Sequence, residues 1–438
     1  MKKSLLILLF TCWALFFAAF RPVMPFAAET AAFPDGTPVT GGRILMGTIG
    51  EPSNLIPYMA SDSASGEITG LLYVAPLKYD KDLNVVPWAA ASYEVLEGGR
   101  LLRFVLRDDI RWEDGVPLTA DDVEFTYKLM IDPKTPTAYS GDFLAIESFK
   151  KTGRLSFEVR YAKPFARSLM TWMGAILPKH VLEGQDIMTT PVARKPIGAG
   201  PYRLAKWDAG SMLTLTASDT YFEGRPNLDE VVYRIIPDPS TMFLELKAGK
   251  LDMMSLSPQQ YLRQTQGPQW ERDWRKYRYL SFSYTFLGFN LEHPFFKDVR
   301  VRRAISMAID RQSLIDGVLL GQGVPTVGPY KPGTWAYNDK LTPVRQDVDE
   351  ARRLLDEAGW KKDKDGLLER DGKPFLFTIL VNQGNDSRIK AAIIIQSQLK
   401  ALGITVHIRT VEWAAFIKEF VNKGHFDAII LAWTITLD

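Results

Sequence analysis

The chain has 438 residues, enough for two or three domains, of which 46% are hydrophobic and 24% are charged. This globular composition excludes a disordered, coiled-coil or collagen-like protein. Its 53 Lys and Arg nearly balance its 51 Asp and Glu, and no basic run marks a surface for nucleic acid or anionic lipid. The single cysteine, Cys12, leaves the rest of the chain without disulfides, thiolate zinc sites, iron–sulfur clusters or thiol catalysis.

The first residues are typical of an export signal. Two lysines precede the apolar run Leu5–Phe20, and small residues end the segment at Ala27 and Ala28. This pattern predicts a cleaved signal peptide over residues 1–28. An uncleaved anchor helix is the alternative, but the run is slightly short for a hydrocarbon core of about 30 Å. No lipobox precedes Cys12, which argues against a lipoprotein and favours a Gram-negative periplasm.

Three elements are predicted in the first part of the chain. Arg43–Ile49 reads as a strand that ends at the breakers of residues 50–52. Leu101–Arg107 reads as a second strand. Thr119 is the expected N-cap of a helix over Ala120–Met130, whose apolar residues recur at helical spacing.

The last third of the chain shows a regular alternation of elements. A helix is expected after Asp298, and another over Asp349–Ala358, which Gly359 ends. Strands and helices then alternate over Phe375–Val381, Arg388–Leu402, Ile404–Ile408, Trp413–Asn422 and Ala428–Trp433. Short links between them predict parallel strands with right-handed crossovers. Ligands bind such sheets beyond the carboxyl ends of the strands, which here are Asn382, Arg409 and Trp433.

Enzyme and metal motifs are missing from the sequence. Gly198-Ala199-Gly200 begins like a dinucleotide-binding loop, but Pro201 and Arg203 stand where a helix start and a third glycine are needed, so we interpret it as a turn. The four histidines are far apart, and none forms an H-x-x-x-H pair. The sequence therefore predicts no catalytic residue, no metal site and no cofactor.

Several short motifs, in order and at consistent spacing, resemble one family. They are Trp112–Val123 (WEDGVPLTADDV), Pro196–Tyr202 (PIGAGPY), Tyr221–Pro226 (YFEGRP), Ala248–Asp252 (AGKLD) and Asp298–Arg311. Together they resemble the extracellular solute-binding proteins of ABC importers in the oligopeptide/dipeptide/nickel class. Ala199 stands in place of the family's usual threonine. Each motif is weak alone, and most of these residues have plain structural roles.

The resemblance implies an α/β, two-lobed periplasmic binding protein fold with an extra inserted domain. Residues 40–73 and 194–284 would form the first lobe, 74–193 the inserted domain and 285–438 the second lobe. Because family members normally continue beyond the position of Asp438, the second lobe is expected to be incomplete.

The function that the resemblance implies is capture of a peptide in the interlobe cleft and its delivery to a membrane ABC permease. The protein would be a monomer that binds no nucleic acid, holds no cofactor and performs no chemistry. A carrier of another solute, such as a nickel chelate or an oligosaccharide, is the first alternative. An exported hydrolase is the second, because carboxylates can meet in space without a sequence motif.

Candidate ligand contacts follow from the same resemblance. They are Trp433, Thr436, Asp438, Asn382, Asn290, Ser61 and Asp62. Trp433 ends an apolar strand that is expected to be buried, so a core role is its alternative. The family's loop after this strand usually reads W-x-x-D, with the aspartate paired to a peptide's amino terminus. Thr436 occupies that position here and Asp438 is the first acid, so capture of a free amine is in doubt.

Overall fold

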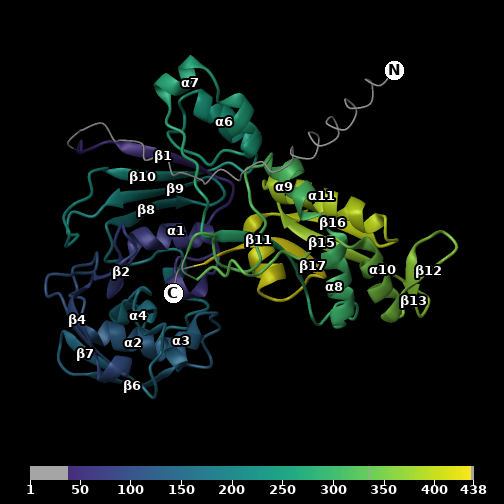
Figure 1. Cartoon of the computed structure of the whole chain (residues 1–438). Coiled ribbons are helices and arrows are strands. Elements are labelled where there is room, and N and C mark those ends of the chain that lie inside the picture. The colour runs from purple at the N-terminus through teal and green to yellow at the C-terminus, as the bar shows by residue number, and fades with distance from the viewer. Residues whose placement is uncertain (1–37, 335, 436–438) are drawn as a thin grey trace, which may run out of the picture.

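The computed structural model describes residues 38–334 and 336–435 (Figure 1). The predicted signal segment 1–28 and the candidate residues Thr436 and Asp438 lie outside the described residues. The chain forms a first lobe and a second lobe side by side, with a further β-rich domain next to the first lobe (Figure 1).

The first lobe is built on a four-stranded sheet of order β1-β10-β9-β8. Its strands are β1 (Arg43–Thr48), β8 (Tyr202–Asp208), β9 (Met212–Ala217) and β10 (Glu230–Ile235). β1 pairs in parallel with β10, and the other pairs are antiparallel. Helix α6 (Pro239–Lys247) packs on Leu45 and Ile49, and α1 (Ser63–Leu72) lies against β8. The predicted strand at the start of the chain is therefore confirmed, one residue shorter than expected.

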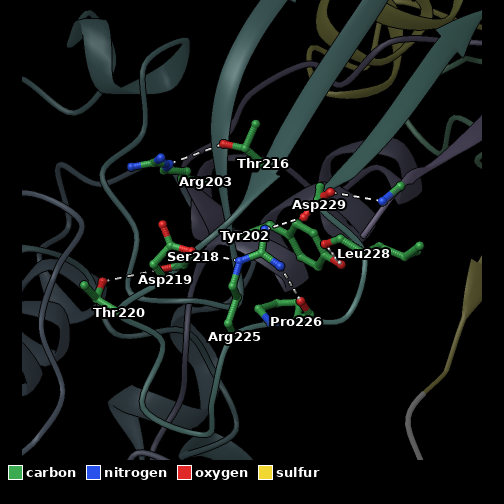
Figure 2. Close-up of polar contacts among 11 residues, drawn as sticks. Tyr202, Arg203, Thr216, Ser218, Asp219, Thr220, Arg225, Pro226, Leu228 and Asp229 are labelled. Atoms are coloured by element: carbon green, nitrogen blue, oxygen red, sulfur yellow. Dashed lines mark hydrogen bonds and ion pairs between the residues drawn. The ribbon is translucent and has the colours of Figure 1, made fainter. Parts of the chain in front are cut away.

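An arginine in the loop before β10 fixes the start of β1 (Figure 2). Arg225 contacts the carboxylates of Asp219 and Asp229. The second carboxylate oxygen of Asp229 accepts the backbone N–H of Gly42 at 3.0 Å. The motif at Tyr221–Pro226 thus has a structural role, because it joins strands that are far apart in sequence.

The inserted β-rich domain carries an antiparallel sheet of order β4-β5-β7-β6. Its elements are β4 (Ala90–Leu96), β5 (Leu101–Leu106), β6 (Ile146–Lys151), β7 (Ser156–Tyr161) and the helix α2 (Ala120–Ile131). Thr119 caps α2 as predicted, in a capping box with Asp122. One buried cluster joins this sheet to the first lobe, since Phe104 and Trp112 belong to the same cluster as Leu213 and Tyr233. The two parts therefore share a core.

Two glycines allow the chain to pass closely over the end of α1. A Cβ added at Gly198 would lie 1.9 Å from the carbonyl oxygen of Leu72, and one at Gly200 would lie 2.5 Å from that of Leu71. The N–H of Gly200 donates to the oxygen of Leu72 at 2.8 Å. This segment was expected to be a turn; in the structure it is a close backbone contact that leaves no room for a Cβ at either glycine.

The second lobe contains a sheet of order β11-β17-β15-β16. Its strands are β11 (Ser283–Phe289), β15 (Leu376–Asn382), β16 (Thr405–Val411) and β17 (Ala428–Thr434). β15 pairs in parallel with both β16 and β17, as predicted, whereas β11 pairs antiparallel with β17 and was not predicted. The crossovers run through α11 (Asp386–Lys400) and through α12 (Trp413–Ala415), which continues as the π-helical η5 (Phe416–Val421).

The two faces of this sheet have different covers. Helices α8 (Val299–Ala308), α10 (Val348–Glu357) and α11 contribute to one buried cluster with the sheet. Phe416 and Ile417 of η5 contribute to another, with Ile429 and Leu431. Asp298 caps α8 as predicted, while Asp347 caps α10, so that helix begins one residue earlier than expected.

The remaining elements are short or lie at the periphery. They are η1 (Pro57–Met59), β2 (Leu77–Tyr79), β3 (Val85–Pro87), η2 (Glu97–Gly99), α3 (Ser140–Leu144), α4 (Ser168–Thr171), α5 (Lys179–Leu182), η3 (Pro191–Ala193), η4 (Gln260–Gln264), α7 (Pro268–Asp273), α9 (Arg311–Leu319), β12 (Lys361–Lys362), β13 (Leu368–Arg370) and β14 (Lys373–Pro374).

The close contact at Gly198 generates a stability prediction. Gly198→Ala is expected to lower the free energy of unfolding by about 2–3 kcal/mol, because the added methyl overlaps a backbone oxygen that cannot rotate away. Gly66→Ala in α1 is the control, since its Cβ meets nothing within 4 Å, and a gain of about 0.5–1 kcal/mol is expected there. Urea denaturation of both variants measures this, and a Gly198→Ala protein as stable as the parent would contradict it.

Candidate functional site

Three parallel strands of the second lobe end at the same edge of the sheet. They end at Asn382, Val411 and Thr434. Beside this edge lies a cavity of about 840 Å³. Its walls come from β11, α8, α9, the first turns of α11 and the loop 322–332, all in the second lobe. Asn385, Ser387 and Arg388, which follow the carboxyl end of β15, line the cavity, so it reaches the region where open α/β sheets bind ligands, and it is large enough for a small organic molecule.

Arg388 is the second arginine, with Arg311, among the residues that line this cavity. The side chain of Asn385 caps α11 by accepting the N–H of Arg388 at 3.0 Å, which places Arg388 in the first turn. Burial lowers the pKa of Arg388 to about 10. No ion pair joins it to an acid within residues 38–334 and 336–435. A partly desolvated positive charge without a counter-charge favours an anionic group in the cavity.

Asn382 orients this arginine. Its side chain is 1% exposed, and its Oδ1 accepts a hydrogen bond from Nη1 of Arg388 at 2.7 Å. Its Nδ2 donates to the carbonyl oxygen of Gln383 at 3.3 Å. The sequence-predicted residue Asn382 therefore lies at the site, where it acts on the guanidinium rather than presenting a free amide.

Trp433 lies on the other face of the same sheet. Ile430 lines the cavity, and a side chain three positions further along a strand points to the opposite face. Trp433 is 49% exposed, and its ring stacks on Phe286 with ring centres 6.2 Å apart. Burial of this residue, expected from the apolar strand, is wrong, because β17 extends beyond the residues that η5 covers. Its role in ligand binding stays a prediction.

Asp62 and Ser61 lie at the start of α1 in the first lobe. Asp62 is 5% exposed and caps α1 by accepting the N–H of Ser65 at 2.9 Å. The same carboxylate accepts hydrogen bonds from the hydroxyls of Ser53 and Ser65. Ser61 is exposed beside it. Asp62 is therefore held in place by its own lobe.

Asn290 lies at the opposite edge of the second-lobe sheet. It follows β11, which runs antiparallel to β17, so it is near the amino end of β17. Its Nδ2 donates to the carbonyl oxygens of Gly424 and Phe426 at 3.0 and 2.9 Å. The fold thus does not bring Asn290 to the edge at which Asn382 and Trp433 lie.

Arg388 lines the cavity and Trp413 follows a neighbouring strand end, and the sequence singled out neither of them. Arg388 follows Asn382 by six residues, and Trp413 follows Val411, the end of β16, by two. Ligands bind at the carboxyl ends of parallel strands, and the first turn of the helix after each strand lies at the same edge. Extending the rule to these first turns would have predicted both positions. Arg409, expected at a strand end, lies within β16.

Two kinds of feature are not found in the described part of the chain. Residues 38–334 and 336–435 contain no group of three or more His, Cys, Asp or Glu side chains placed to hold a metal ion. The helices described there include none with the length and apolarity needed to cross a bilayer.

Comparison with known proteins identifies one family for this chain. Residues 84–438 match the model of the bacterial extracellular solute-binding proteins, family 5. The oligopeptide-binding protein AppA of Bacillus subtilis is 34% identical over 92% of this chain and 75% of its own length.

Solved structures agree with this match. The structure of Bacillus subtilis AppA in complex with a nonapeptide has a TM-score of 0.85 and 33% identity, and covers 91% of this chain and 80% of its own. That of NikZ from Campylobacter jejuni with Ni(L-His) has a TM-score of 0.78 and 27% identity, and covers 90% and 78%. These similarities confirm the predicted α/β, two-lobed binding-protein fold.

The exposure of Trp433 generates a second stability prediction. Trp433→Ala is expected to change the free energy of unfolding by no more than about 1 kcal/mol, because half of the ring already contacts solvent. Phe377→Ala on β15 is the control: its ring is fully buried, and a loss of about 3–5 kcal/mol is expected. Chemical denaturation compares the two. An equal loss of unfolding free energy in the two variants would show that Trp433 has a core role.

Proposed function

We propose, since the chain belongs to the bacterial extracellular solute-binding proteins of family 5, that it captures an oligopeptide between its lobes and delivers it to a membrane ABC permease. Proteins of this family work outside the cytoplasm. The finer proposal is a monomer in a Gram-negative periplasm, exported by cleavage of residues 1–28, that performs no catalysis.

The observation that carries the proposal is Arg388, which lines a cavity of the second lobe and makes no ion pair with an acid among the described residues. A peptide has a carboxylate of matching charge and geometry, and a two-pronged arginine–carboxylate contact is stronger than a contact between neutral groups. Asn382 holds the guanidinium from the side without neutralising it. Arg388 is therefore proposed to bind a carboxylate of the peptide.

The half-exposed ring of Trp433 supports the same ligand class. An aromatic surface gives apolar contact to many different side chains with little sequence preference. The end of β17 pairs with β11 on one side, but its pairing with β15 on the other side stops at Ile429, so an extended peptide could pair there as a further strand. Apolar contact and main-chain pairing together suit a ligand of variable sequence.

A metal chelate of an amino acid is the second candidate, because its carboxylate would fit Arg388 equally well. The similar structure of NikZ, which was solved with Ni(L-His), supports this candidate. It differs from a peptide in having no extended main chain to pair with a strand.

The carboxylate contact can be tested with two matched libraries of nonapeptides, one with free and one with amidated carboxyl termini. The parent chain is expected to retain the free-carboxyl library at least about tenfold better, the scale of one hydrogen bond to a charged group. Mass spectrometry of the retained peptides measures this. Nickel–histidine in a third arm tests the chelate, and exclusive retention of nickel–histidine would replace the peptide proposal.

Substitution of Arg388 separates a specific contact from general charge. Arg388→Met is expected to abolish the preference for free carboxyl termini and to weaken retention about tenfold. Arg303→Met is the control, because Arg303 is an exposed arginine of α8 that does not line the cavity. Equal effects of the two substitutions would contradict a direct role for Arg388.

Trp433→Ala is expected to weaken binding of a retained nonapeptide by about 2 kcal/mol, the scale of an aromatic hot spot. Isothermal titration calorimetry measures the affinity. An unchanged affinity would remove Trp433 from the ligand site.

A further inference from the structure

Trp413 reaches from the second lobe to the first. Its Nε1 donates a hydrogen bond to Oδ1 of Asp62 at 3.4 Å, across 351 residues of sequence. A Cβ added at Gly50 would lie 2.9 Å from Cβ of Trp413 and 3.0 Å from its Cγ. The side chain therefore rests on the bare backbone of Gly50, and any larger residue at position 50 would push the two lobes apart.

Both partners of this contact are fixed by their own lobes. Asp62 is held by Ser53, by Ser65 and by its position as the cap of α1. Trp413 stacks on Phe416, with ring centres 6.1 Å apart and planes 25° from parallel. Little freedom is thus lost when the indole meets the carboxylate.

A second close approach lies between the same lobes. Gly384, two residues after β15, has φ +79°, and a Cβ there would lie 2.3 Å from the carbonyl oxygen of Pro237 and 3.5 Å from Cβ of Ile49. Ile49 and Pro237 follow β1 and β10 of the first lobe. Gly50 of the first lobe and Gly384 of the second lobe thus both permit the backbones of the two lobes to approach closely.

We infer that Trp413, Asp62 and Gly50 form an interlobe latch, which makes Trp413 a positioning residue for ligand capture. This inference rests on the proposed function, because closure over a ligand is the state that the latch stabilises. The lobes share no sheet within the described residues, so opening them breaks the hydrogen bond and the packing on Gly50. Loss of one hydrogen bond as long as 3.4 Å is expected to reduce the ratio of closed to open molecules about five- to tenfold, the scale of an ordinary net hydrogen bond.

The latch can be tested without any ligand by single-molecule fluorescence energy transfer. Cys12 is the single cysteine, so a full chain with Cys12→Ser, Lys206→Cys and Lys362→Cys accepts one dye on each lobe. Lys206 of β8 and Lys362 of β12 are both exposed. Trp413→Phe keeps the stacking on Phe416 but removes the indole N–H, and it is expected to shift the distances between dyes toward the open state.

Two further variants control this measurement. Trp88→Phe also removes an indole hydrogen bond, to Tyr221, but within the first lobe and its inserted domain, and it should leave the distances between dyes unchanged. Gly50→Ala adds a methyl group against Trp413 and should open the lobes as Trp413→Phe does. Distances for Trp413→Phe identical to those of the parent would overturn the latch.

The affinity for the free-carboxyl nonapeptide library separates the two proposals. A five- to tenfold weaker retention by Trp413→Phe, with open lobes, supports both. If the parent retains no peptide while Trp413→Phe still opens the lobes, the proposed function fails and the latch stands. If the parent and Trp413→Phe retain peptide equally and show the same distances, the latch alone fails.

Discussion

The parallel pairing of β15 with β16 and β17 is the constraint on which the candidate site depends. Parallel neighbours need crossover helices, so each strand end is followed closely by the first turn of a helix. Arg388 comes from the helix after β15, Trp413 from the helix after β16, and Trp433 from the end of β17 itself. One hydrogen-bonding pattern thereby places a cation, a contact to the other lobe and an exposed aromatic ring along a single edge of the sheet.

The distribution of buried clusters divides the molecule into two bodies. The first lobe and the inserted domain share a cluster that contains both Phe104 and Leu213, so they should move together. The second lobe has clusters of its own around Phe377 and Phe416, and none of the clusters among the described residues crosses between the lobes. The described chain passes from one body to the other through residues 274–282, between α7 and β11. Apolar burial therefore does not lock the lobes, and polar or close backbone contacts such as that of Trp413 can control closure.

The sequence predicted those elements whose signals are local. Caps such as Thr119 and Asp298, and the alternation of strands and helices after Phe375, depend on spacing within a few residues. β11 was missed because its partner β17 lies more than a hundred residues later, and nothing local in Ser283–Phe289 marks an antiparallel edge. The contact between Trp413 and Asp62 was missed for the same reason. The burial of Trp433 was mispredicted because the apolar composition of a strand indicates only how buried its residues are on average. The exposure of one residue depends on where the covering helix ends.

The neutral character of Asn382 decides what Arg388 can do. A carboxylate at position 382 would cancel the guanidinium charge and leave no reason for an anion to enter the cavity. The amide oxygen accepts one N–H and fixes the plane of the group, yet it leaves the positive charge uncompensated. The resulting cost of partial burial appears as the lowered pKa of Arg388. A bound carboxylate would remove this cost, so the burial that lowers the pKa of Arg388 would also favour an anionic group over a neutral one.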